Sequence, residues 1–210
     1  MYFVCHFWEE SFMNDSKNPS AVRSKAEICQ ALLRLMEKHP YEEITVKQIA
    51  LEAKLVRKTF YRNFDSKEDV LEAIFDSLVN EYKNHLIMLK DTLPIEMIFE
   101  FCIQRRQLLL LFDKNNMMYR IQQKLNDALP EKHEELKALG LVPQELFGEL
   151  DPSYLIPMNI GSVWNVICRW VHTGMKDDPK KITAELTEFI IRMGVFAQKM
   201  KAAYQEKAQA

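Results

Sequence analysis

The apolar positions of this chain recur every three or four residues from about residue 20 onward, which is the spacing of α-helices. Proline and glycine interrupt the pattern at intervals and divide it into about nine predicted helices, so the pattern favours an all-α fold. Among them we expect one helix over residues 95–112 and an acidic helix from Pro130 to about Gly140, followed by a connector up to Pro152. The last predicted helix has the most regular stripe: Ile182, Leu186, Phe189, Met193, Phe196 and Met200. A stripe at this heptad-like spacing predicts that the helix packs against other helices.

Residues 45–71 contain three short predicted helical pieces in close succession. Thr45, followed three residues later by Gln48, is the pattern of a capping box and begins the first piece. The second piece is predicted over roughly Arg57 to Asn63, and Ser66 caps the third. The pattern therefore predicts two short helices joined by a tight turn, followed by a longer one.

The second of these helices has two chemically different sides. Val56, Phe60 and Phe64 fall on one side by helical spacing and are predicted to face inward. The other side carries three cations and a phenol: Arg57, Lys58, Tyr61 and Arg62. The DNA major groove admits a helix, and Arg and Lys donate to guanine O6 and N7, so this side is a candidate reader of base edges. The alternative is an ordinary solvated basic face.

The run VKQIALEAKLVRKTFYRNFDSKEDVL resembles the helix-turn-helix of TetR/AcrR-type bacterial transcription regulators. The matching positions are Ala53, the Lys54-Leu55-Val56 turn, Thr59, Tyr61, Phe64 and Ser66-Lys67-Glu68. Lys54 departs from the family's glycine, and Val56 from its helix-capping serine; each change costs on the order of 1 kcal/mol. The resemblance implies a three-helix DNA-binding domain followed by a helical domain that binds a ligand and dimerises.

This resemblance implies a division of the chain into a flexible extension (1–19), a helix-turn-helix domain (20–66) and a ligand-binding and dimerisation domain (67–210). The charge agrees, because residues 20–67 carry a net +4 whereas the chain as a whole carries −2. The predicted DNA contacts are Thr45, Lys47, Arg57, Lys58, Thr59, Tyr61, Arg62 and Lys67. Among them, Thr45, Tyr61 and Lys67 are expected to hold phosphates, Lys67 together with the N-terminal end of its helix.

In the family, a small molecule binds in a cavity among the central helices of the second domain. The resemblance implies the following candidate lining, although most of these residues could instead be core: Phe99, Cys102, Arg106, Met117, Tyr119, Trp164 and Cys168. It also implies a four-helix interface between two subunits. The expected interface residues are Trp164, Trp170, Phe189, Met193, Phe196 and Met200; burial within one chain is the alternative.

Other classes of protein find little support. The four cysteines form no zinc pattern, no metal site or cofactor motif is readable, and the enzyme motifs with fixed spacing are missing. The residues before Met13 do not read as a signal peptide, and we expect Met13 to be the natural initiator. Residues 153–175 are too polar for a membrane span.

The sequence therefore predicts a cytoplasmic, homodimeric DNA-binding regulator, a repressor released from its operator by a small-molecule effector. One competing reading is a protein of the same fold that has lost operator binding and acts as a coregulator through a protein partner. Lys54 and Val56 favour that reading. A more distant one is an all-α enzyme that transforms its ligand, which turnover without DNA would reveal.

Overall fold

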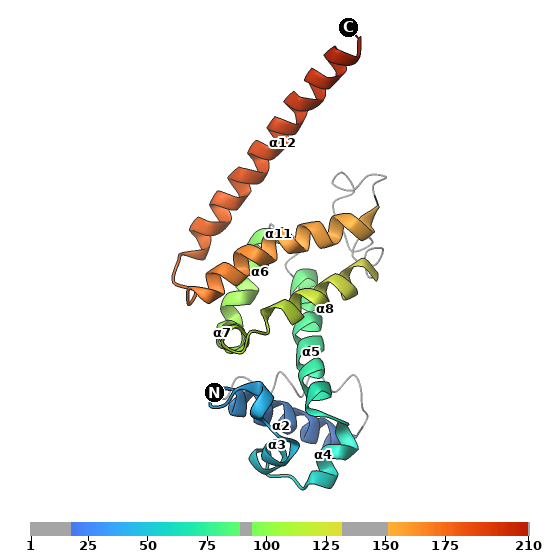
Figure 1. The fold of residues 1–210 in the computed structure, drawn as a ribbon, viewed down its shortest axis with the longest axis vertical. Helices are drawn as coiled ribbons and strands as arrows, with labels where there is room; N and C mark the ends of the chain where they lie inside the picture. The colour runs from blue at the N-terminus through green and yellow to red at the C-terminus, as the bar shows by residue number, and fades with distance from the viewer. Residues whose placement is uncertain (1–17, 89–93, 132–150, 210) are drawn as a thin grey trace.

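The computed structural model describes residues 18–88, 94–131 and 151–209, and these ranges are helical throughout apart from turns (Figure 1). The first part comprises α2 (Pro19–Met36), the 3₁₀ helix η1 (Tyr41–Glu43), α3 (Val46–Glu52), α4 (Arg57–Asn63) and α5 (Lys67–Met88). The second comprises α6 (Pro94–Gln104), α7 (Arg106–Lys114), α8 (Met118–Glu131), α11 (Pro152–His172) and α12 (Pro179–Gln209). The predicted flexible extension before residue 18, the acidic helix after Glu131 and the connector up to residue 150 lie outside the described residues.

The helices α2, α3 and α4 form a compact head, and local signals set their limits. The Asn18 side chain accepts a hydrogen bond from the Ser20 N–H, and Pro19 occupies the first turn of α2. Thr45 and Gln48 form the predicted capping box at the start of α3. The two hydrogen bonds between Ser66 and Asp69 do the same for α5.

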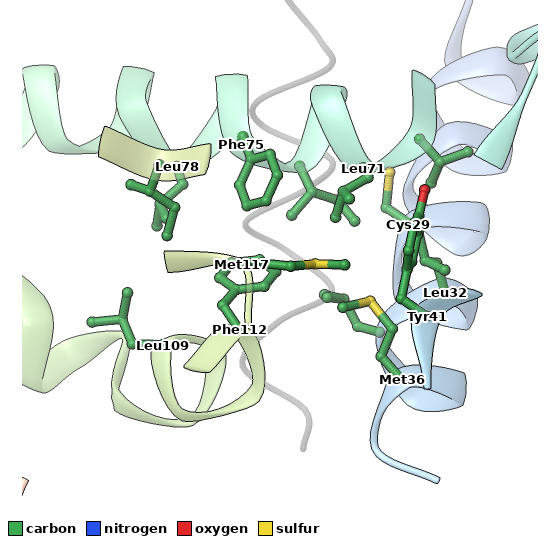
Figure 2. Close-up of a cluster of buried hydrophobic side chains, with 14 of the residues drawn as sticks. Cys29, Leu32, Met36, Tyr41, Leu71, Phe75, Leu78, Leu109, Phe112 and Met117 are labelled. Carbon is green, nitrogen blue, oxygen red and sulfur yellow. The ribbon is translucent and has the colours of Figure 1, made fainter. Parts of the chain in front are cut away.

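Helix α5 runs out of the head and into the remaining helices, which we call the body (Figure 1). It packs against α2 in the head and against α6 and α8 in the body. Figure 2 shows Met36 from the head facing Met117 and Phe112 from the body, with Leu71 and Phe75 of α5 beside them. The Phe75 and Phe112 rings lie 5.0 Å apart. Head and body therefore share one continuous hydrophobic core along α5.

The single helix predicted over residues 95–112 is two helices, α6 and α7, which meet at Arg105. The backbone of Arg105 leaves the helical region there (φ −105°, ψ 18°), and its guanidinium pairs with Glu81 on α5. Arg106 donates instead to the backbone carbonyls of Gly174 and Met175 beyond α11. The apolar spacing gave no sign of this break, because contacts made by two adjacent arginines fix it.

A second difference concerns Pro130, which was expected to begin a new helix but lies in the last turn of α8. Proline there removes one backbone hydrogen bond without ending the helix. The next two helices start as proline and aspartate signals indicate. Asp151 accepts from the Ser153 N–H at the start of α11, and Asp178 accepts from the Lys180 N–H at the start of α12.

Helix α12 extends far beyond the body in its second half (Figure 1). Large apolar side chains there are between 41% and 62% exposed: Phe189, Ile190, Ile191, Met193, Val195, Phe196 and Met200. We call this segment, residues 189–200, the α12 arm. Of the helices that the structure describes, none combines the length and the hydropathy that crossing a membrane requires.

Candidate nucleic-acid interface and effector cavity

Helix α4 presents its cationic side to solvent. Phe60 is fully buried and Phe64 nearly so, and together they anchor the helix against the head. Arg57, Lys58 and Arg62 are exposed, which is the arrangement that helical spacing predicted. A short helix held by aromatic residues on one side and cationic on the other can enter a major groove with its long side chains extended.

Tyr61 stands between these cations with 48% of its surface exposed. The Arg57 guanidinium lies 5.9 Å from the centre of the Tyr61 ring, and one of its nitrogens is 3.5 Å from the phenol oxygen. The ring therefore restrains the arginine along the helix while leaving guanidinium donors open to solvent.

Val56 does not face inward as helical spacing suggested. It is the N-cap of α4, with an extended backbone (φ −79°, ψ 147°), and its side chain is 68% exposed. The helical period does not apply to a residue that precedes the helix. No side chain caps α4, whereas Lys54 adopts a left-handed conformation (φ 57°), as expected where the family has glycine.

The residues at the start of α3 are also accessible. Lys47 is exposed, and so is Thr45, whose hydroxyl is already engaged with both the N–H and the side-chain oxygen of Gln48. Thr59 is half-buried, and its carbonyl accepts from the Asn63 side chain. Phosphate or base contacts by these threonines stay predictions.

Lys67 has a role that the sequence did not indicate. Its ammonium group donates to three backbone carbonyls, those of Tyr41 (2.9 Å), Glu42 (3.0 Å) and Ile44 (2.9 Å). It also lies 4.5 Å from the centre of the Tyr41 ring. All three N–H donors are thus engaged inside the chain, and the expected phosphate clamp would have to replace one of them. Backbone carbonyls carry no sequence signal, so this role was missed.

The body holds a small apolar cavity at the place where an effector site was expected. Its volume is about 20 Å³, which is room for little more than one water molecule. The lining comes from α5, α6, α7, α8 and α11: Leu78, Val79, Tyr82, Ile98, Phe101, Cys102, Leu109, Ile121, Leu125 and Trp164. Burial raises the pKa of the Cys102 thiol to about 12, so this thiol is neutral at physiological pH.

Only Cys102 and Trp164 of the seven predicted effector residues line this cavity. Phe99 is buried against the Trp170 ring, and Cys168 is half-buried outside the cavity lining. Arg106, as described, holds the loop after α11. Met117 belongs to the core between head and body, and Tyr119 lies on the surface beside it. Helical spacing does not distinguish a residue that lines a cavity from one that lies in the core or on the surface. The predicted set of seven therefore mixes all three kinds.

The two tryptophans predicted at the subunit interface lie inside the chain instead. Trp164 is 4% exposed and its indole N–H donates to the Met118 carbonyl; Trp170 is 3% exposed and donates to the Asp177 carbonyl. Their side chains are therefore used within one subunit. The other four predicted interface residues, Phe189, Met193, Phe196 and Met200, all lie on the exposed α12 arm.

A helix-turn-helix head with an exposed basic helix, joined through α5 to a helical body, is the architecture that the sequence resemblance predicted. The profile of the family described as "Bacterial regulatory proteins, tetR family" matches residues 28–74, from α2 into α5. This part of the chain is therefore similar to the TetR family, the family that the sequence resemblance named.

One curated relative is the HTH-type dhaKLM operon transcriptional activator DhaS of Lactococcus lactis subsp. lactis (strain IL1403). It is 32% identical over 98 residues, which are 42% of this chain and 49% of the relative. The match thus spans about half of that relative's length. Both this relative and the family are transcription regulators rather than enzymes, in agreement with the sequence prediction.

Among solved structures, the chain is similar to the fatty acid degradation regulator FadR from Bacillus halodurans. The TM-score is 0.51 at 20% sequence identity, and the similarity covers 82% of this chain and 95% of the other. At this identity the similarity supports the all-helical fold alone, and it extends that fold through the body as well as the head.

Proposed function

We propose that the protein is a cytoplasmic transcriptional regulator that binds double-stranded DNA as a homodimer. The observation that carries this proposal is the geometry of α4. Phe60 fixes the helix from behind, and Arg57, Lys58 and Arg62 extend from its other side into solvent. Each subunit would place α4 in the major groove, where arginine and lysine donate to guanine and the shorter polar groups approach phosphates.

The α12 arm supports the dimer. A run of large apolar side chains exposed on more than one side of a helix is unusual in a soluble monomer and marks an interaction surface. A second copy supplies the same arm, so a two-fold arrangement would cover both at once. Two heads related by such an axis read half-sites about one helical turn of DNA, or a multiple of it, apart.

Helix α5 supports control by a small-molecule effector. Its middle residues Leu78, Val79 and Tyr82 line the apolar cavity, and its first residue, Lys67, donates to carbonyls of η1 and of Ile44 just after it. The cavity has a volume of only about 20 Å³, well below the roughly 300 Å³ of small-molecule sites. An apolar effector would therefore have to push α5, α6 and α11 apart, and α5 would carry this displacement to the head.

Selection of protein-bound DNA from a random pool, followed by mobility shifts on the selected site, tests the DNA-binding proposal. We expect Arg57→Ala to relax base preference at one position, at a cost of about 1–3 kcal/mol in affinity for the selected site. Lys180→Ala, which removes an exposed cation from the start of α12 in the body, is the control. If wild-type protein enriches no sequence, the coregulator reading replaces this one.

The direction of regulation is a separate measurement. The sequence reading favoured repression, whereas the Lactococcus relative is named as an activator. A reporter gene placed behind the selected site measures the sign directly, with Arg57→Ala as the control that weakens the effect in either direction.

A further inference from the structure

A second pocket, larger than the apolar cavity, lies between the head and the body. It is a cleft of about 340 Å³, open to solvent, and it is separate from both the α4 surface and the apolar cavity. Two loops form most of it: residues 38–42, which join α2 to α3, and residues 114–117, which join α7 to α8. Tyr119 and Arg120 at the start of α8 complete the lining.

The cleft is rich in positive charge. Lys38, Lys114 and Arg120 line it together with one carboxylate, that of Glu42, and His39 adds an imidazole. Lys38 and His39 belong to the head, whereas Lys114 and Arg120 belong to the body. Cations from two parts of the molecule thus converge on one hollow, although the chain as a whole carries a net charge of −2.

The two cations of the body, Lys114 and Arg120, are each held in place by a hydrogen bond that uses only part of their N–H donors. The Lys114 ammonium donates to the Glu37 carbonyl at 2.7 Å, and an ammonium has two further N–H groups. One Arg120 nitrogen is 3.0 Å from a Glu72 oxygen, and the guanidinium lies 5.8 Å from the centre of the Phe75 ring. A guanidinium has five N–H donors, and among the residues that the structure describes Glu72 is the acceptor given for this one. These contacts preorganise the body side of the cleft.

We propose that this cleft binds a small polyvalent anion, a phosphate ester or a polycarboxylate, between Lys38 and His39 on the head and Lys114 and Arg120 on the body. Its volume falls at the lower end of small-molecule sites, which suits a compact metabolite. A bound anion would bridge the two sides and fix the angle of the head. The effect of this on DNA binding depends on the function proposed above, whereas the binding itself does not.

Calorimetric titration of the full chain with inorganic pyrophosphate and, separately, citrate tests the site. We expect saturable binding of pyrophosphate that weakens at least tenfold in Lys38→Gln/Lys114→Gln. Lys180→Gln/Lys181→Gln removes the same charge from α12 and should bind as wild type does. Arg57→Ala/Arg62→Ala should do so too, because it alters only the α4 surface. Citrate binding alongside pyrophosphate indicates general recognition of polyvalent anions, and its absence indicates phosphate recognition; both support the site.

Absence of saturable binding to wild type, or loss of binding in the Arg57/Arg62 variant with the cleft variant unaffected, overturns the proposal. Should Lys114→Gln unfold the chain, as circular dichroism would reveal, Lys38→Gln/His39→Asn alters only exposed side chains of the same cleft and takes its place.

A mobility shift with and without pyrophosphate, at matched ionic strength, then examines the regulatory part. Pyrophosphate should change the DNA affinity of wild type and leave that of the cleft variant unchanged; equal effects on both would contradict it. If no DNA is bound at all, the proposed function fails while the calorimetric result still decides the site.

Discussion

Replacement of Lys67 by methionine isolates the most concentrated set of polar contacts in the head. Methionine keeps an apolar stem of similar length but removes the ammonium, which donates to the carbonyls of Tyr41, Glu42 and Ile44. It also removes the charge above the Tyr41 ring. We therefore expect the connection between the start of α5 and η1 to weaken without any loss of core volume.

The size of the effect follows from these contacts. A hydrogen bond to a charged group contributes roughly 1.5–3 kcal/mol. The three bonds share one ammonium, and the exposed Glu42 segment can bind water in its place, so the sum overstates the loss. We expect a decrease of about 2–4 kcal/mol in the free energy of unfolding, a large part of the 5–15 kcal/mol typical of a domain.

Urea denaturation followed by circular dichroism, at fixed protein concentration, measures this loss as a lower midpoint with an unchanged slope. Lys58→Met is the matched control, because it removes an exposed cation from α4 and should change stability by less than about 0.5 kcal/mol. Equal midpoints for the two variants would refute the reasoning.

DNA binding separates the two roles considered for Lys67. If it also holds a phosphate, Lys67→Met lowers the salt dependence of affinity by about 0.9 in the logarithmic slope. If its role is only the internal one, affinity falls with the slope unchanged, whereas Lys58→Met lowers affinity and slope together.

Three further predictions concern α4, α12 and the buried thiol of Cys102. Val56→Ser supplies the missing cap of α4 and should raise the free energy of unfolding by about 1 kcal/mol; an unchanged urea midpoint would contradict it. Phe189→Asp/Phe196→Asp places two charges on the α12 arm and should convert the proposed dimer into a monomer by light scattering, whereas the control Lys181→Gln should not. Equal masses for the two variants would contradict a dimer built on this arm. Burial raises the pKa of Cys102 to about 12 from an ordinary value of 9.0, so the unfolded chain loses this proton first as pH rises. Stability should therefore fall from about pH 9 upward, and Cys102→Ala should flatten that part of a pH series of urea midpoints; identical pH profiles for the two proteins would exclude a contribution from this thiol.

The head could be predicted closely because its signals are local. A hydroxyl followed by an amide or acid three residues later marked the starts of α3 and α5, and the limits of α4 agree with the expected Arg57 to Asn63. Such pairs act within one helical turn, so their meaning does not depend on the rest of the fold. Val56 is exposed rather than inward-facing because it is the N-cap of α4, and the helical spacing applies only from Arg57 onward.

The body could be predicted less well because its decisive contacts join distant segments. The break at Arg105 depends on Glu81, and the position of Trp164 depends on the Met118 carbonyl, neither of which a periodic pattern encodes. Periodicity identifies an apolar face but does not say whether its own chain or a second copy covers it. Trp170 is covered by its own chain, whereas Phe196 on the following helix is 62% exposed.

The shared core explains why the head of this protein cannot be treated as a separate unit. Met117, the residue just before the body's α8, packs between the α5 residues Leu71 and Phe75 and Met36 of the head (Figure 2). Phe75 in turn contacts Phe112, one turn from Leu109, which lines the apolar cavity. Close-packed interiors respond to an inserted ligand by moving whole helices. An effector that widened the cavity would therefore shift α7 and α5 together. The same shift would alter the distance between the Lys114 ammonium and the Glu37 carbonyl. Binding of a ligand in the apolar cavity should therefore change the affinity of the cationic cleft for its anion, because both depend on the position of the head.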